Sequence, residues 1–292
     1  MPKNLKVSVC MITYGHESFI EEAINSVLMQ EVDFDFELII SNDASPDNTD
    51  EIVRSIIKNH PLGYKIRYIK QEFNIGMMPN SVFILKECKG EFIAVCEGDD
   101  YWTDPLKLQK QVDFLENNPG FSLCFHNAIL KSGENERKML GELSKQIFNT
   151  DDILGQWFIP TASIVFRNYP DFVIPDWFVN CQSGDIPLLL LLSLRGDFKY
   201  IDAVMSTYRH HAGGISNTHR EYSKVIGMVY IYQSFNFHTN LRFDKKVKEA
   251  IIYEIQCHLP EIQELKTLKR AGNTVFRKTL KRLKNKAGKL FR

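Results

Sequence analysis

The 292-residue chain has no excess charge of either sign, no closely paired cysteines and no long apolar run. Its six cysteines never form a Cys-x-x-Cys pair, which argues against zinc or a disulfide framework and favours buried free thiols in a reducing compartment. The longest apolar stretch, Ile186–Leu194, is far shorter than the ~20 residues of a membrane-spanning helix. Residues 1–6 are polar, so we expect a cytoplasmic protein without an export signal or a membrane span.

The balanced total of 36 basic and 36 acidic residues hides an uneven distribution. Eleven basic residues lie between Leu265 and Arg292, a segment without Asp or Glu, so the rest of the chain is acidic. An acidic body argues against specific nucleic-acid binding. Apolar residues recur every three or four positions from 274 to 292, which predicts a basic amphipathic helix that docks on the anionic inner face of the cell membrane. Packing on its own domain, or nonspecific RNA binding, is the alternative.

Strand and helix patterns alternate four times over the first 120 residues. Ser18 and Glu21 form a capping-box pattern that predicts the start of the first helix, and Pro79 is expected to begin the third. Strands are expected at 5–13, 36–41, 64–69 and 91–96. Such alternation indicates an α/β fold with a parallel sheet.

The pattern after residue 120 is less regular, with strands expected at 121–130, 162–167 and 198–208. Helices are expected at 185–194, 221–237 and 244–257. We therefore divide the chain into a domain at 1–215, with halves 1–120 and 121–215, a helical extension at 216–260, and the basic helix at 261–292.

Polar clusters follow three of the predicted strands: Thr13-Tyr14, Asn42-Asp43 and Asp99-Asp100. The carboxyl ends of parallel strands gather at one edge of a sheet, where ligands bind. Adjacent carboxylates repel each other unless a cation neutralises them, and hard oxygen ligands select Mg²⁺ or Mn²⁺ together with phosphates. The clusters therefore predict a metal–diphosphate site, with a solvated acidic turn as the alternative.

Several segments resemble, in the expected order, those of family 2 glycosyltransferases. They are Val7–Tyr14 (first strand and uracil-contacting end), Ser41–Thr49 (Asp-Asp-Gly-Ser-type loop), Asn74-Ile-Gly76 with Asn80 (Asn-x-Gly…Asn stretch), Glu97-Gly-Asp-Asp-Tyr-Trp-Thr-Asp-Pro105 (metal-binding DxD region) and Ser183-Gly-Asp185 (segment of the catalytic base). The resemblance covers roughly residues 5–215. It implies a Rossmann-like nucleotide-diphospho-sugar transferase fold, with a central, mostly parallel mixed sheet flanked by helices and a helical C-terminal extension.

The same resemblance implies an enzyme that transfers a sugar from a nucleotide-sugar with Mn²⁺ or Mg²⁺ as cofactor. Asp185 would deprotonate the acceptor hydroxyl. Asp100, Asp99 and His211 would bind the metal, and the segment 208–215 would fold over the diphosphate. The implied donor-binding residues are Thr13, Tyr14, Asp43, Asn74, Gly76, Asn80, Asp99 and Arg209.

Aromatic and hydroxyl side chains are expected to line the acceptor side, because Trp and Tyr often stack on sugar rings. They are Trp102, His126, Thr161, Ser163 and Trp177. Three positions depart from the family pattern: Gly15 stands where Asn is frequent, Glu97 replaces the first Asp of the metal motif, and Gly184 replaces the Glu before the base.

Two other functions remain as alternatives. A nucleotidyltransferase needs a glycine-rich, basic grip on phosphate near the first strand, which residues 13–19 lack. A non-catalytic, membrane-docked binding protein would not need the intact set of acids. The resemblance to family 2 glycosyltransferases therefore implies an inverting hexosyl- or N-acetylhexosaminyltransferase that uses a UDP-sugar and a glycan or lipid-linked glycan acceptor in surface polysaccharide synthesis.

Overall fold

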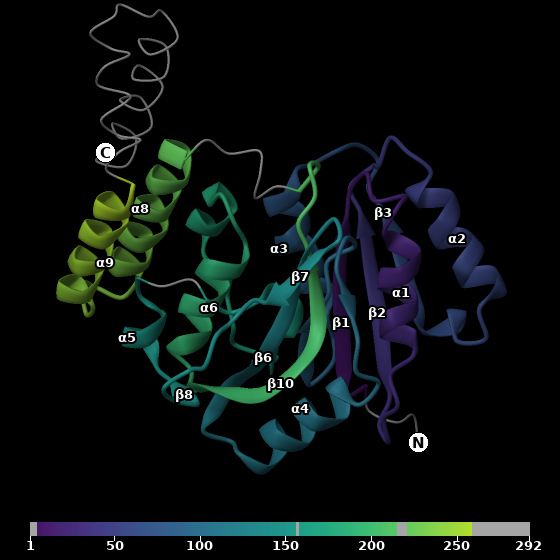
Figure 1. Cartoon of the computed structure of the whole chain (residues 1–292), viewed down its shortest axis with the longest axis horizontal. Coiled ribbons are helices and arrows are strands. Elements are labelled where there is room, and N and C mark those ends of the chain that lie inside the picture. Colours follow the sequence, from purple (N-terminus) through teal and green to yellow (C-terminus); the bar gives the residue numbers. More distant parts are fainter. Residues whose placement is uncertain (1–4, 156–157, 215–220, 259–292) are drawn as a thin grey trace, which may run out of the picture.

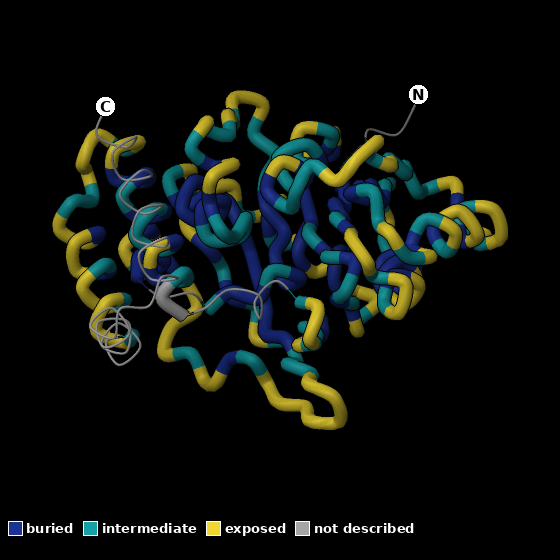
Figure 2. Tube along the Cα trace, turned by 90° about the horizontal axis from the view of Figure 1, so that it is seen from above, coloured by how far each residue is buried: buried dark blue, intermediate teal, exposed yellow. Residues whose placement is uncertain are grey.

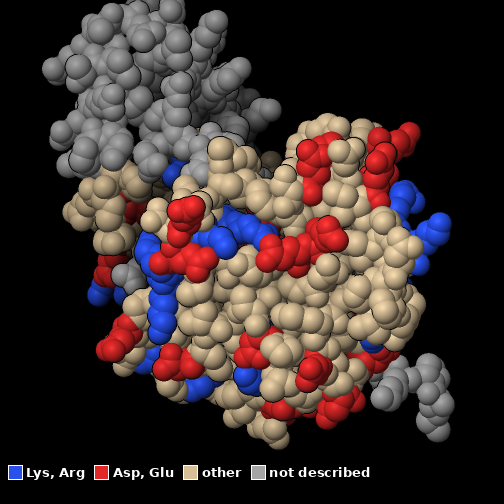
Figure 3. All heavy atoms as spheres, turned by 45° about the vertical axis from the view of Figure 1, so that its right-hand side comes forward, with Lys and Arg blue, Asp and Glu red and all other residues tan. Residues whose placement is uncertain are grey.

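The computed structural model describes residues 5–155, 158–214 and 221–258, which form one mixed sheet with helices on both faces (Figure 1). The strand order is β3-β2-β1-β4-β9-β6-β10-β5, with β7 on β6 and β8 on β10. On the face shown in Figure 3, acidic and basic side chains lie interspersed, and neither sign covers that face.

The first four strands run parallel and make one half of the sheet: β1 (Val7–Thr13), β2 (Phe36–Asn42), β3 (Ile66–Lys70) and β4 (Phe92–Val95). Helices follow them in turn: α1 (Ile20–Leu28), α2 (Thr49–Asn59), α3 (Met77–Glu87) and α4 (Lys107–Asn117). A short 3-10 helix, η1 (Gly63–Lys65), precedes β3. The predicted α/β alternation over residues 1–120 is confirmed, and the register places Thr13 opposite Asn42.

The other half of the sheet mixes directions. Its strands are β5 (Tyr101–Trp102), β6 (Phe121–Ser132), β7 (Asn135–Lys138), β8 (Ile147–Phe148), β9 (Val165–Arg167) and β10 (Asp197–Arg209). β9 joins β4 to β6 by antiparallel pairing, and β10 runs parallel to β6. Because β5 pairs with the end of β10, with Thr207 opposite Tyr101, the segment after Asp100 lies beside the carboxyl end of β10.

The remaining helices are α5 (Thr150–Ile153), η2 (Thr161–Ser163), η3 (Asp176–Asn180), α6 (Asp185–Ser193), α8 (Glu221–His238) and α9 (Asp244–Cys257). α8 packs on α9 and on α6, at the end of the molecule away from α1 and α2 (Figure 1). None of the helices in the described ranges is long and apolar enough to cross a membrane. The predicted basic helix at 261–292 lies outside the described residues.

Alternating side chains of the strands build one core on each face of the sheet. Val9 and Met11 of β1 pack with α1, α2 and α4, whereas Cys10 packs with α3 and α6 on the other face. Figure 2 shows the buried residues concentrated along the strands and the exposed ones on the outer helices and loops. All six cysteines are free, and all but Cys257 are buried, as the sequence predicts for thiols of the core.

Two predicted helix starts are wrong. No side chain caps α1, which begins at Ile20, because residues around Ser18 belong to a loop that is bonded to the loop after β2. α3 begins at Met77, so Pro79 lies within the first turn, where its missing amide hydrogen leaves no bond unmade.

Candidate active site

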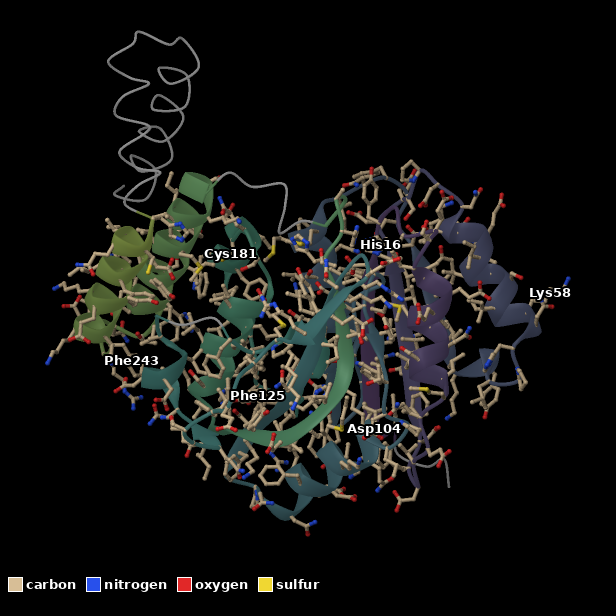
Figure 4. The ribbon with its side chains drawn as sticks, viewed as in Figure 1. His16, Lys58, Asp104, Phe125, Cys181 and Phe243 are labelled. Atoms are coloured by element: carbon tan, nitrogen blue, oxygen red, sulfur yellow. The ribbon has the colours of Figure 1, made fainter. Side chains whose placement is uncertain are left out.

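The carboxyl ends of β1, β2 and β4 meet at one edge of the sheet. The Asp43 amide donates to the Thr13 carbonyl at 3.0 Å, and the Gly98 amide donates to the Ile12 carbonyl at 3.0 Å. The three polar clusters predicted to share a rim are therefore neighbours. Figure 4 shows His16 near the upper ends of these strands.

The loops after β1 and β2 are hydrogen-bonded to each other. Three backbone amides of the first loop donate to side chains of the second: Gly15 to Ser45 Oγ (3.0 Å), His16 to Thr49 Oγ1 (3.0 Å) and Glu17 to Asp47 Oδ2 (2.9 Å). In return, Glu17 Oε2 accepts from the Asn48 amide at 3.0 Å. These bonds fix the turn that presents Tyr14, whose side chain is about half exposed at 47%.

Asp43 connects the rim to the loop before α3. The carboxylate is buried, and its two oxygens accept from the amides of Ile75 at 2.7 Å and Gly76 at 2.9 Å. Gly76 has a φ of +93°, a left-handed conformation that favours glycine, and Asn74 Oδ1 also accepts from its amide. The structure therefore brings Asp43, Asn74 and Gly76 together.

Two predicted donor residues lie beneath the surface of the rim. Asn80 is buried, where its Oδ1 accepts from Ser41 Oγ at 2.5 Å and its Nδ2 donates to the Ser41 carbonyl at 3.1 Å. Thr13 is also buried, with its hydroxyl 3.2 Å from His16 Nδ1. Asn80 anchors α3 to β2, and Thr13 reaches the site through His16.

The acid motif contains a buried carboxyl group, Asp100, and a partly buried one, Glu97, beside Asp99. Burial raises the pKa of Asp100, and the charge of Asp99 adds to this shift. Burial also raises the pKa of Glu97, with further contributions from Asp99, Asp100 and Asp185. Asp100 Oδ1 accepts from the Arg209 amide at 2.9 Å, but its Oδ2 is buried with no hydrogen-bond partner among the described residues.

The pKa of Asp99 is lowered, in contrast to those of Asp100 and Glu97, because two imidazole rings face its carboxylate. His211 Nε2 lies 3.1 Å and His16 Nε2 lies 3.7 Å from Asp99 Oδ2. Burial acts to raise the pKa of Asp99, but the hydrogen bond with His211 and the nearby charge of His16 outweigh it and lower the pKa. Burial lowers the pKa of His16, although Asp99 opposes this effect. Asp99 is therefore the acid of the motif most readily ionised without a cation.

Arg209 fastens the end of β10 to the motif. Its guanidinium donates to the Asp99 carbonyl at 2.8 Å, pairs with Glu22 of α1, and lies over the Tyr101 ring at 4.2 Å. The predicted phosphate-binding side chain is thus at the site, with its charge directed to Glu22.

Asp185, the predicted base, begins α6 on the other side of the rim. Its Oδ1 accepts from the Ile186 amide at 2.9 Å, and its Oδ2 accepts from Thr161 Oγ1 at 3.3 Å. The Ala162 carbonyl, next to Thr161, accepts at 2.9 Å from Nε1 of Trp102, two residues after Asp100, so Asp185 lies near the acid motif. The charge of Asp185 contributes to the raised pKa of Glu97. Gln182, just before this segment, donates to Ser223 of α8 at 3.2 Å, so the helical extension also supports it.

Three predicted acceptor residues lie in the core instead of at a surface. Trp102 is 1% exposed because α1 covers β5, and its indole nitrogen donates to the Ala162 carbonyl. His126 lies inside the central strand β6, and the Ser163 hydroxyl donates to the Pro160 carbonyl at 2.6 Å; both side chains are fully buried. Thr161 is at the site through Asp185, and Trp177 is half-buried on η3.

The acid motif offers carboxylate oxygens that could hold a cation. Within residues 5–155, 158–214 and 221–258, no three His, Cys, Asp or Glu side chains are grouped as metal ligands, and His211 faces Asp99. The unpartnered Oδ2 of Asp100 beside Asp99 nevertheless suits Mg²⁺ or Mn²⁺, which bind through one or two carboxylates and complete their shells with water and phosphate.

Sequence reasoning missed His16, Glu22 and Tyr101. Tyr101 adjoins the acid motif, but its stacking with Arg209 depends on the pairing of β5 with β10. His16 lies in the turn directly after the first strand, a position that could have identified it.

The fold is of the GT-A type. A sequence model of glycosyl transferase family 2 matches residues 8–172, more than half of the chain. The chain belongs to this family. The matched segment includes the acid motif and ends before Asp185.

Two relatives show what the chain is similar to. An uncharacterized protein of Mycobacterium tuberculosis is 34% identical over 218 residues, which cover 72% of this chain and 60% of the relative. The chain thus spans about three fifths of the length of that relative. The GalNAc(5)-diNAcBac-PP-undecaprenol beta-1,3-glucosyltransferase of Campylobacter jejuni is 28% identical over 163 residues, 52% of this chain and 50% of the relative.

Solved structures confirm the predicted fold. Residues 1–349 of Staphylococcus aureus TarS, in complex with UDP-GlcNAc, superpose with a TM-score of 0.65 at 18% identity, covering 86% of this chain and 73% of TarS. A mannosyltransferase from Pyrobaculum calidifontis, in complex with GDP-Man and Mn2+, gives 0.57 at 13% identity, with coverage of 98% and 84%.

Proposed function

We propose that this protein is an inverting glycosyltransferase that moves a hexosyl or N-acetylhexosaminyl group from a UDP-sugar to an acceptor hydroxyl. The observation that carries the proposal is the link from Asp185 through Thr161 and the Ala162 carbonyl to Trp102, which follows the acid motif, although the two segments are more than 80 positions apart in the sequence. Such a pair of facing sites can hold a nucleotide-sugar at one side and activate an acceptor at the other.

Different residues bind the donor and activate the acceptor. Tyr14 and the Asn74–Gly76 loop, which Asp43 anchors, hold the nucleoside at the end of β1 and β2. Asp185 accepts the proton of the acceptor hydroxyl as the oxygen attacks the anomeric carbon, which contributes about 10² to 10⁴-fold. Thr161 orients its carboxylate, and a single displacement from that side inverts the anomeric centre.

Asp100 and Asp99 would hold a Mn²⁺ or Mg²⁺ ion together with the diphosphate, with His211 as a third ligand if it turns from Asp99. A cation bound there stabilises the negative charge that grows on the departing diphosphate. Arg209, at the same edge, adds positive charge near the phosphates.

The acceptor is proposed to be a glycan or lipid-linked glycan. The name of the Campylobacter jejuni relative, which specifies an undecaprenol-linked substrate, supports this class. UDP is favoured over GDP by the likeness to TarS, the structural neighbour with UDP-GlcNAc. The catalytic domain would comprise residues 1–215, with 216–260 as a support, and the basic segment 261–292 would dock the enzyme on the cytoplasmic face of the membrane.

Two substitutions test the proposal. In Asp185→Asn, we expect turnover to fall about 10² to 10⁴-fold while UDP-sugar affinity is unchanged, because only the proton acceptor is lost. In Asp100→Ala, we expect Mn²⁺-dependent donor binding to disappear. Asp151→Asn, a change at an exposed position on α5, is the matched control. Full turnover in Asp185→Asn would remove the base assignment.

Product analysis separates this function from its alternatives. A glycosyltransferase releases UDP, whereas a nucleotidyltransferase releases pyrophosphate. Calorimetry that detects no binding of UDP with Mn²⁺ would instead favour a non-catalytic binding protein.

A further inference from the structure

His16 reaches from the turn after β1 to the acid motif, and the roles above leave it unassigned. Its side chain is largely buried, with 17% exposed. Its backbone amide is bonded to Thr49 Oγ1 at 3.0 Å, and its Nδ1 lies 3.2 Å from the Thr13 hydroxyl. Both the backbone and the ring of His16 are therefore fixed by neighbouring loops.

Gly98 shows how closely this pair packs on the motif. A Cβ atom at position 98 would lie 2.7 Å from Thr13 Oγ1 and 2.9 Å from His16 Nδ1, closer than side-chain contacts allow. Glycine is thus required between Glu97 and Asp99 for the Thr13–His16 pair to rest against the backbone.

The far nitrogen of the ring faces Asp99. If the Thr13 hydroxyl donates to Nδ1, the neutral ring carries its hydrogen on Nε2, directed at Asp99 Oδ2. The distance of 3.7 Å exceeds a hydrogen bond, so the contact is electrostatic in this arrangement. Nδ1 thus faces Thr13 and Nε2 faces the Asp99 carboxylate, which leaves neither ring nitrogen directed toward a cation.

His211 shares the same carboxylate oxygen at 3.1 Å. If His211 bound the metal, its Nε2 would have to leave the Asp99 carboxylate. The ring of His16 would then be the imidazole that still faces Asp99. Groups that orient a ligating carboxylate commonly change metal affinity or activity by about 10- to 100-fold.

Building on the proposed function, we propose that His16 is a positioning residue: it holds the Asp99 carboxylate in the orientation that binds a divalent cation together with a nucleoside diphosphate. The Thr13 hydroxyl sets the direction of the His16 ring, and Gly98 allows the approach.

The test is the Mn²⁺ affinity of the full chain in the presence of UDP, with GDP in parallel. In His16→Asn, the amide can replace Nδ1 toward Thr13 but does not reach Asp99, so we expect Mn²⁺ to bind at least about 10-fold more weakly. In His16→Gln, the amide nitrogen takes the place of Nε2, so we expect most of the affinity to return. Glu51→Ala, at an exposed position on α2, should leave Mn²⁺ affinity unchanged.

A double substitution shows whether His16 acts through Asp99. In the Asp99→Asn background, His16→Asn should cause no further loss of Mn²⁺ affinity. Equal losses in the Asn and Gln variants, in step with a lower thermal midpoint, would reduce His16 to a structural residue. Wild-type affinity in His16→Asn, with the loss retained in Asp100→Ala, would overturn this inference alone. Absence of Mn²⁺ binding by the wild-type protein with either nucleotide would overturn the proposed function as well.

Discussion

On the proposed donor side of the rim, the loops after β1 and β2 are joined by hydrogen bonds of 2.9 to 3.0 Å between backbone amides and side chains. On the proposed acceptor side, Thr161 donates to Asp185 at 3.3 Å. Beneath β5, the Lys107 nitrogen and His126 Nε2 are buried without hydrogen-bond partners in the described part of the chain. The donor side is therefore preorganised by its bonds, while the region behind the acceptor side contains uncompensated polar groups. Substitutions on the donor side should therefore reduce stability. Substitutions on the acceptor side should alter turnover, and those at the buried groups behind it should raise stability.

The largest effect is expected on the donor side, at Asp43. Asp43→Ala removes the buried carboxylate that accepts from the amides of Ile75 and Gly76, and Asn74 replaces it only at Gly76, so the free energy of unfolding should fall by about 2–4 kcal/mol. Urea denaturation measures this free energy of unfolding. Asp33→Ala, at an exposed position, should change it by less than about 0.5 kcal/mol. Equal stability of the two variants would contradict the preorganised donor loop.

An increase in the free energy of unfolding is expected at Lys107, which lies behind the acceptor side. This lysine is fully buried, its nitrogen lies 4.0 Å from the Trp102 ring centroid, and burial lowers its pKa to about 7. Lys107→Met fills the same space without a charge, so it should raise the free energy of unfolding by about 1–4 kcal/mol at pH 6. Lys58→Met on the exposed face of α2 is the control.

The same lysine predicts a pH dependence. Between about pH 7 and the ordinary pKa of 10.5, unfolded Lys107 holds a proton that the folded form lacks, so its contribution makes stability rise with pH in this window. Below pH 7 both forms are protonated and the full cost of burial is present. Urea denaturation from pH 6 to 9 should show this rise in the wild-type protein and a flatter profile in Lys107→Met. Identical profiles would contradict the buried, destabilised lysine.

A smaller effect, on turnover alone, is expected at Thr161. Thr161→Val removes the hydroxyl that donates to Asp185, and the loss of one hydrogen bond of about 1 kcal/mol should lower kcat roughly 3- to 10-fold without changing donor affinity. Ser163→Ala, in the same turn but bonded to Pro160, should leave kcat unchanged. A larger loss of kcat in Ser163→Ala than in Thr161→Val would contradict the role of the Thr161 hydroxyl in orienting Asp185.

The smallest effect is expected at Ala44, which follows Asp43 with a φ of +54°. Ala44→Gly removes the penalty of this left-handed conformation, so it should raise the free energy of unfolding by ~0.5 kcal/mol. Asn240→Gly, at a φ of +52°, should change little because Asn tolerates that conformation. Thermal unfolding compares the two, and a lower midpoint for Ala44→Gly would count against strain at this position.

The parallel half of the fold could be predicted because its strands are buried on both faces and its helices are amphipathic. The meeting of Thr13, Asp43 and Asp99 at one edge followed from the direction of parallel strands. The mixed half could not be derived in the same way, since the insertion of β9 between β4 and β6 depends on antiparallel pairing between distant segments.

The acceptor residues show where residue type misleads. Trp102 and His126 are chemically suited to bind a sugar, but their strands place them in the core. Conversely, His16 has no motif of its own, and its contact with Asp99 exists only because two loops hold the turn in place. Polar residues at predicted strand ends were reliable guides to the site, whereas those within strands were not.

The most direct test of a shared donor and acceptor site is a crystal structure of the protein with UDP and Mn²⁺. We expect Mn²⁺ at the carboxylates of Asp99 and Asp100, bridged to the diphosphate, with the Asp185 carboxylate facing the space where the sugar would lie. A cation bound away from Asp100, or Asp185 turned away from the diphosphate, would contradict the proposed glycosyl transfer.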